Sequence, residues 1–116
     1  MRINVIHPKH LADQHLVAEY QEIKMLPKSL RRSLNAVKGF SWDKVPVSYT
    51  LNKGHGYFFY NKLDYIEMWL YSLIDEMKNR NFKTTSCSID CSGFNNDFYS
   101  DYVPTKEAIE INLERI

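Results

Sequence analysis

The beginning of the chain combines three groups that can do chemistry together: an α-amine, an arginine and a glutamate. Arg2 follows Met1 directly, and Glu22 comes two helical turns after His15. An α-amine can attack carbon and form an imine, a guanidinium beside it disfavours the ammonium form, and a carboxylate can move protons or stabilise positive charge. These residues define a candidate imine-forming site that needs no metal and no cofactor.

A helix is expected to carry this glutamate. It opens at about Leu11, or two residues later with Asp13 as the N-cap, because Asp accepts hydrogen bonds from the free amides of a helix start. Its apolar stripe, at spacings of four and three, consists of Leu16, Tyr20 and Ile23. Seven residues return a helical side chain to within about 20°, so His15 and Glu22 share a face that borders the stripe. A catalytic pair and a solvated helix face both fit this spacing.

The remaining pattern predicts two further helices and an all-α fold. Pro27 should kink or restart the first helix, whose second part runs from Ser29 to about Val37, carries Arg31 and Arg32, and closes at Lys38-Gly39. A second long helix should run from Tyr57 or Asn61 to Asn79. Its apolar positions are Leu63, Ile66, Leu70, Leu73, Ile74 and Met77.

The last helix should start after Thr105 as N-cap and reach Ile116, with Ala108, Ile109 and Leu113 pointing inward. Residues 40–56 and 81–103 are interpreted as loops. In the first loop, Val47–Leu51 has no evident partner strand, and Lys53 and His55 are interpreted as solvated residues, with phosphate contact as the alternative. The sequence therefore predicts one compact domain, residues 1–116, of three main helices joined by long loops.

Composition narrows the class of protein. With 44% hydrophobic and 25% charged residues, the 116-residue chain is typical of a folded globular domain. No apolar run approaches the roughly 20 residues of a membrane span. Charges and histidines interrupt any signal-peptide pattern, so a cytoplasmic location is expected, that of the host cell if the chain is phage-encoded. Cys87 and Cys91 stand alone, which predicts free thiols and no metal site.

The charges are unevenly distributed along the chain. Residues 1–62 contain ten Lys and Arg against four acids, whereas residues 63–116 contain five against ten, although the net charge is only +1. Such asymmetry can produce a basic face on a nearly neutral protein. It permits an anionic partner without requiring one.

Four blocks of the sequence resemble, in order, the pyrimidine-dimer DNA glycosylases, the phage endonuclease V family. The first block is MRINVIHPKHLADQHLVAEYQEI, residues 1–23. The others are Gly54-His55 with Phe58-Phe59-Tyr60 and Lys62-Leu63, then Asn81-Phe82, then Asp101-Tyr102-Val103-Pro104 with Ile109 and Arg115. The resemblance covers nearly the whole chain without large gaps.

This resemblance implies a DNA repair glycosylase with abasic-site (AP) lyase activity. Such an enzyme acts on damaged or abasic double-stranded DNA, here expected as a monomer without a metal or cofactor. An N-terminal α-amine displaces the damaged base from C1′ and forms an imine, and β-elimination then breaks the strand. Met1 holds the position of the nucleophile, and Glu22 matches the catalytic glutamate. The residues expected to bind DNA are Arg2, Gln14, His15, Gln21, Lys24 and Arg115.

The sequence also departs from the family. The best-known members begin Met-Thr-Arg and use the threonine amine, whereas here Arg2 directly follows the initiator. Two site arginines of the family fall on Gln21 and Met25, and the sequence ends at Ile116, before the family's aromatic-rich tail. Retention of Arg2 and Glu22 favours an enzyme. The missing arginines and tail favour a non-catalytic DNA-binding homologue, and a small helical interaction domain with a chance resemblance is the third interpretation.

Overall fold

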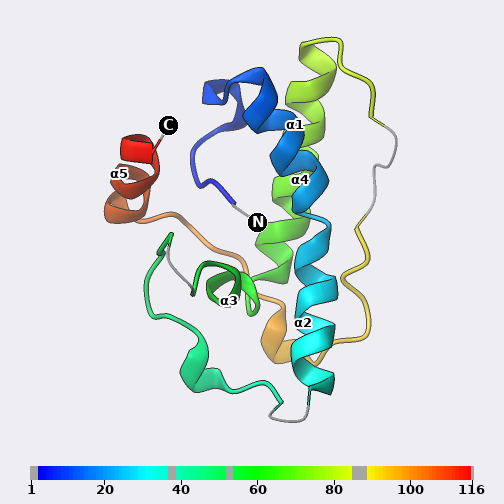
Figure 1. Ribbon diagram of the computed structural model, residues 1–116, viewed down its shortest axis with the longest axis vertical. Helices are drawn as coiled ribbons and strands as arrows, with labels where there is room; N and C mark the ends of the chain where they lie inside the picture. The colour runs from blue at the N-terminus through cyan, green and yellow to red at the C-terminus, as the bar shows by residue number, and fades with distance from the viewer. Residues whose placement is uncertain (1–2, 37–38, 52–53, 85–88, 116) are drawn as a thin grey trace.

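Five α-helices form the regular structure in the computed structural model, which describes residues 3–36, 39–51, 54–84 and 89–115 (Figure 1). They are α1 (Asp13–Glu22), α2 (Met25–Asn35), α3 (His55–Phe59), α4 (Leu63–Asn79) and α5 (Lys106–Arg115). Single 3-10 turns lie at Pro8–His10, Trp42–Lys44 and Asn96–Phe98. No β-strand occurs within the described ranges, and the predicted all-α class is confirmed. Two of the three predicted helices are each divided into two, which gives five.

The first predicted helix is divided at Ile23 and Lys24, before the proline. Pro27 is only the third residue of α2. At that position the missing N–H has no intrahelical acceptor to lose, so the proline is tolerated inside the first turn. The predicted end of the helix is also wrong. α2 stops at Asn35, and Gly39 lies beyond it with a positive φ of 67°.

The start of α1 also differs from the expectation. Ala12 is extended and Asp13 is the first helical residue, so the helix begins after Leu11, and Asp13 is not the N-cap. Its carboxylate instead pairs with Arg80 at the far end of α4 (2.9 Å). This ion pair ties the beginning of α1 to the end of its neighbouring helix.

The second predicted helix starts earlier and is interrupted. A short helix, α3, begins at His55, and α4 begins after Lys62, whose backbone is not helical. The predicted end at Asn79 is confirmed. All six apolar positions predicted for this helix are buried: Leu63, Ile66, Leu70, Leu73, Ile74 and Met77.

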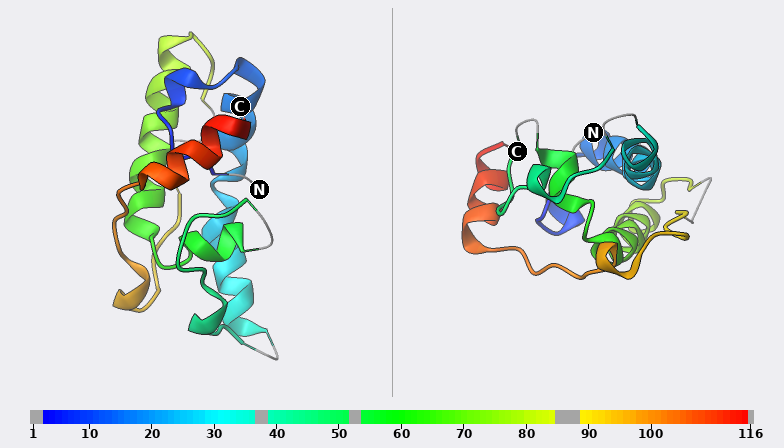
Figure 2. Two further views of the ribbon diagram at one scale, coloured as in Figure 1. Left: turned by 90° about the vertical axis from the view of Figure 1, so that its left-hand side faces the viewer. Right: turned by 90° about the horizontal axis from the view of Figure 1, so that it is seen from below.

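The core lies between α1 and α4, which run side by side, while α2 continues beyond α1 (Figures 1 and 2). The predicted stripe of α1 faces it, because Leu16, Tyr20 and Ile23 are no more than 1% exposed. Each fully buried large side chain of this kind contributes about 1.5–3 kcal/mol relative to an exposed one. The packed pair of α1 and α4 therefore provides the main support for the shorter elements.

The C-terminal helix α5 lies on the other side of the beginning of the chain from α1 and α4 (Figure 1). Thr105 caps it as predicted, because its Oγ1 accepts a hydrogen bond from Ala108 N–H (3.1 Å). The prediction that Leu113 points inward is wrong, since Leu113 is 53% exposed and Asn112 is fully buried. Asn112 accepts a hydrogen bond from the buried Val5 N–H, which requires an acceptor that leucine does not have.

Within the described residues, the two segments predicted as loops contain only single 3-10 turns, apart from α3, which begins inside the first of them. Val47–Leu51 is not a strand. Cys91 is buried and free, and burial raises the pKa of its thiol to about 11, while Cys87 lies outside the described residues. None of the described helices is both long and apolar enough to span a bilayer. Among the same residues, no group of three His, Cys, Asp or Glu side chains is arranged to hold a metal ion.

Candidate active site beside the N-terminal segment

Three consecutive backbone amides of the N-terminal segment, residues 3–5, are each bound by a side chain from a different helix. The pairs are Ile3 to His55 Nε2 (2.7 Å), Asn4 to Glu19 Oε1 (2.5 Å) and Val5 to Asn112 Oδ1. The three acceptor residues, here called the amide anchor, are at most 5% exposed. An unpaired buried amide costs about 1–3 kcal/mol. The anchor therefore fixes where the beginning of the chain lies.

His55 has its tautomer set by its two neighbours. Because Ile3 N–H donates to Nε2, that nitrogen carries no proton, and Nδ1 must donate to the carbonyl oxygen of Thr50 (2.7 Å). The ring packs edge-on against Tyr49 and Phe59. At 5% exposed, His55 is neither a solvated loop residue nor a phosphate contact, so both interpretations from the sequence are wrong for it. Lys53 lies outside the described residues.

Glu19 is a carboxyl group buried in the core face of α1, only 2% exposed. Burial raises its pKa to about 7, hydrogen bonds from the backbone and side chain of Asn4 lower it, and the nearby charge of Glu22 raises it. Its second oxygen, Oε2, has no hydrogen-bond partner within the described residues. A carboxylate oxygen without a donor is poorly stabilised, which agrees with the direction of the shift.

Asn112 binds the N-terminal segment with both ends of its carboxamide. Oδ1 accepts from Val5 N–H, and Nδ2 donates to the side-chain oxygen of Asn4 (2.5 Å). Since Asn4 also bonds Glu19, a chain of hydrogen bonds crosses from α5 through the segment to α1. The segment is thus held from both sides.

Glu22 ends α1 one turn after Glu19 and is half-buried. Residues three apart on a helix lie on neighbouring parts of its surface. The charge of Glu22 raises the pKa of Glu19, in agreement with this spacing. Because Glu19 holds Asn4, the candidate catalytic carboxylate stands one turn from the point where the N-terminal segment crosses α1.

The other residues predicted to bind DNA fall into two groups. Along α1, the side chains of Gln14, His15 and Gln21 are exposed, and Lys24 follows with its ammonium 3.9 Å from the centre of the Tyr20 ring. The structure therefore brings four predicted residues onto one helix and the turn after it. The other two, Arg2 and the side chain of Arg115, lie outside the described structure, as does Met1, the predicted nucleophile.

A second amine, on Lys62, is also chemically unusual. Its Nζ donates to the carbonyl oxygen of Phe58 (2.8 Å) and to the side chain of Asn61 (2.9 Å), and it lies 3.9 Å from the centre of the Phe58 ring. Burial lowers its pKa to about 8. An amine with a lowered pKa can form imines, so Lys62 has to be distinguished from the terminal amine experimentally.

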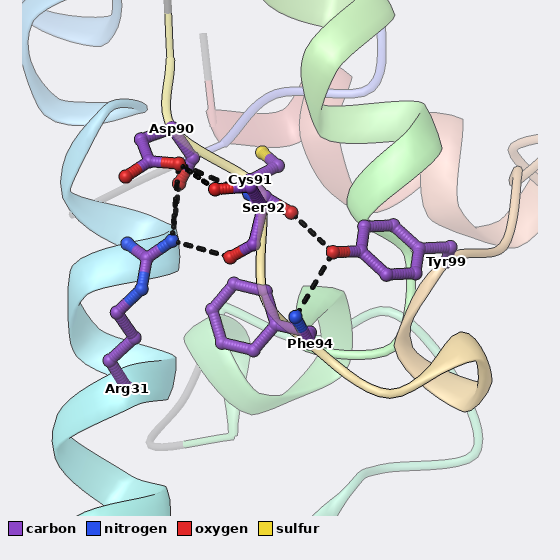
Figure 3. A network of polar contacts seen from close by, with 6 residues as sticks. All are labelled: Arg31, Asp90, Cys91, Ser92, Phe94 and Tyr99. Carbon is purple, nitrogen blue, oxygen red and sulfur yellow. Dashed lines mark hydrogen bonds and ion pairs between the residues drawn. The ribbon is translucent and has the colours of Figure 1, made fainter.

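One arginine of the basic half of the sequence has a structural role. Arg31 in α2 donates to the carbonyl oxygens of Asp90 and Ser92 (3.0 and 2.8 Å) and pairs with the Asp90 carboxylate (3.4 Å), while its guanidinium packs on Phe94 (Figure 3). Hydrogen bonds from Ser92, and then the Arg31 charge, hold the pKa of Asp90 below its usual range. The charge of Arg31 is therefore engaged within the protein.

Sequence reasoning missed all three members of the amide anchor. For Glu19 a signal existed, because it lies about 40° from Ile23 on the helical wheel and hence at the edge of the buried stripe. For His55 and Asn112 no local signal existed. Their partners are 52 and 107 residues away along the chain.

Comparison with protein families gives a match over most of the chain. The family described as pyrimidine dimer DNA glycosylase matches residues 1–90. This span contains α1 to α4, the candidate glutamate and two members of the amide anchor, and it leaves out α5. Arg115 and Asn112 lie beyond it.

Proposed function

The chain belongs to the pyrimidine dimer DNA glycosylase family, and on that basis we propose that it is a DNA glycosylase with AP lyase activity. In this proposal the Met1 α-amine attacks C1′ of a damaged nucleotide in double-stranded DNA. The base leaves, the amine and the opened sugar form an imine, and loss of a C2′ proton expels the 3′ phosphate by β-elimination. Water then hydrolyses the imine and regenerates the amine.

The observation that carries this proposal is the hydrogen bond from Asn4 N–H to Glu19, one helical turn from Glu22. An extended chain spans at most about 3.6 Å per residue, so the two residues before Ile3 reach no further than about 7 Å from it. In the proposal, an amine at the start of this sequence therefore acts near the anchored segment. That segment contacts α1 at Glu19, one turn before Glu22.

The chemistry of the groups supports the same assignment. An α-amine has a reference pKa of about 7.7–8.0, so much of it is a neutral nucleophile near pH 7–8, and the Arg2 guanidinium would lower that pKa further. Glu22 would stabilise the positive charge that develops on the sugar and move the proton during elimination. Arg2, Gln14, His15, Gln21, Lys24 and Arg115 would face the DNA. Reaching C1′ also requires the duplex to be opened at the damaged nucleotide.

A non-catalytic DNA-binding homologue is the second candidate, and specific observations favour it. Gln21 and Met25 stand where the family has site arginines, and Arg31 is engaged with Asp90 and Ser92. Each phosphate contact that is lost weakens affinity and reduces its dependence on salt. This candidate predicts duplex binding without covalent chemistry.

Borohydride trapping on duplex DNA with one abasic site separates the two candidates. The untagged protein should form a covalent adduct whose mass maps to Met1 and not to Lys62. Glu22→Gln should keep duplex binding while strand cleavage falls by at least about 100-fold, because general acid–base groups typically contribute 10²–10⁴-fold. Glu67→Gln, at an exposed position of α4, is the matched control.

The outcomes of this experiment are distinct. Adding one uncleaved residue before Met1 should abolish trapping, and an unchanged rate would exclude the Met1 amine. An adduct at Lys62 would assign the imine to a different amine. Failure to trap, in a preparation that binds the duplex and has a free N-terminus, would establish the non-catalytic homologue.

A further inference from the structure

The amide anchor includes a residue from outside the matched family span. Asn112 belongs to α5, whereas the family match ends at residue 90. It is nevertheless fully buried and binds both the backbone of Val5 and the side chain of Asn4. A fully buried asparagine requires partners for its donor and acceptor, and both lie in the N-terminal segment.

We propose that Asn112 is a positioning residue: its carboxamide holds the N-terminal segment so that the Met1 α-amine lies beside Glu22. This inference rests on the proposed function. It makes α5 a necessary part of the catalytic site, although α5 lies outside the part of the chain that defines the family match.

The backbone amides of residues 3–5 have no acceptor within the N-terminal segment itself. Residues 3–5 are not part of a helix, and their amides find acceptors only in side chains of α1, α3 and α5. Asn112 supplies the acceptor for the third amide. Removing it leaves Val5 N–H buried and unpaired, so the segment moves to find another acceptor.

Asn112 also links the segment to the helix that carries Glu22. Asn4 accepts from Asn112 and also bonds Glu19, which stands one turn before Glu22. Loss of Asn112 therefore removes one contact from each of two consecutive residues, Asn4 and Val5, while Asn4 N–H keeps its bond to Glu19. A displacement of about 1 Å between reacting groups costs on the order of 100-fold in rate.

The test compares Asn112→Leu with the wild-type protein in single-turnover borohydride trapping at saturating abasic duplex. Leucine has a similar volume and removes both polar contacts. The trapping rate should fall by roughly 100-fold, while the KM for duplex, measured separately in steady-state cleavage, stays within about twofold because the Asn112 side chain is fully buried. Hydrogen exchange at Val5 should accelerate. Asn79→Leu, the same change at an exposed position of α4, should leave both quantities unchanged.

If Asn112→Leu does not fold, the milder variant Asn4→Ala tests the positioning role instead. Asn4→Ala removes the partner of Asn112 Nδ2 but keeps the bond to Val5, and it should slow trapping by about tenfold. Where both variants fold, their effects should not add in the double variant, because they break the same contact.

The possible failures are distinguishable. Wild-type protein that binds the duplex and forms no adduct would overturn the proposed function, and this inference with it. Wild-type protein that forms the adduct, together with a folded Asn112→Leu that forms it equally fast, would overturn the inference alone. An increase in KM with an unchanged rate would also overturn it, because it would assign Asn112 to DNA binding.

Discussion

Two non-helical segments of this molecule are attached to helices by hydrogen bonds between side chains and backbone, but their surroundings are opposite. The N-terminal segment is bound by Glu19, His55 and Asn112, which are 2%, 5% and 0% exposed. The segment from Asp90 to Ser92 is bound by Arg31, in a pair whose side chains are 35% and 73% exposed (Figure 3).

This difference in exposure determines how strongly each set of contacts holds its segment. Water can replace a surface hydrogen bond, and salt screens a surface ion pair, so such contacts contribute about 0–1 kcal/mol. A buried amide that loses its acceptor has no replacement and costs about 1–3 kcal/mol. The buried attachment can therefore hold its segment in one position, whereas the exposed one only keeps a connection close to α2.

The largest expected effect is on folding, from His55→Leu. This change removes the acceptor of Ile3 N–H and the ring N–H that donates to the Thr50 carbonyl, and it should lower the free energy of unfolding by about 4 kcal/mol. Urea unfolding followed by circular dichroism measures it. His10→Leu, at an exposed position, is the control. A loss below about 0.5 kcal/mol for His55→Leu would show that the buried attachment is replaceable after all.

The next effect is a pH dependence of stability at the buried attachment. Burial raises the pKa of Glu19 from 4.5 to about 7, so the folded protein binds more protons than the unfolded chain between these values. Stability is therefore fully present below pH 4.5 and is lost as the pH rises through about 7. The shift corresponds to about 3 kcal/mol at most.

Glu19→Gln tests this sign while keeping an acceptor for Asn4 N–H. The unfolding free energy of the wild type minus that of the variant should fall steadily from pH 5 to pH 8, because only the wild type loses stability as Glu19 loses its proton. Glu67→Gln is the exposed control. A difference curve that rises in favour of wild type over this range would mean that Glu19 is held as a carboxylate, as an ordinary ion-paired acid would be.

The two segments also differ in how far the sequence predicts them. The all-α class, the stripe of α1 and the six buried positions of α4 follow from local periodicity, which is present in any short window. The cap at Thr105 is equally local. A buried polar side chain is different, because its partner is chosen by the fold.

Asn112 and Leu113 illustrate this limit. Periodicity assigns the inward position of α5 to the leucine, but Val5 N–H and the Asn4 side chain lie against α5 and require polar partners, so the asparagine is buried. The DNA-binding assignments of Gln14, His15, Gln21 and Lys24 stay predictions. The exposure of Gln14, His15 and Gln21 on α1 is compatible with these assignments and does not test them.

The smallest expected effect comes from Arg31→Ala at the exposed attachment. It should lower the free energy of unfolding by no more than about 1 kcal/mol, and the difference should shrink further in high salt, because both charged side chains are accessible to ions. The change should be local: the amides of Ser92 and Phe94 should exchange faster while the rest of the protein is unaffected.

Arg32→Ala, one residue along and exposed, is the matched control and should produce neither effect. A loss from Arg31→Ala as large as that from His55→Leu, and insensitive to salt, would remove the distinction between the two attachments. The packing of the guanidinium on Phe94 would then be the dominant contribution of Arg31, because a contact that salt does not weaken is not an ion pair. Arg31→Leu separates these contributions, since leucine retains apolar contact with the ring and loses the charge.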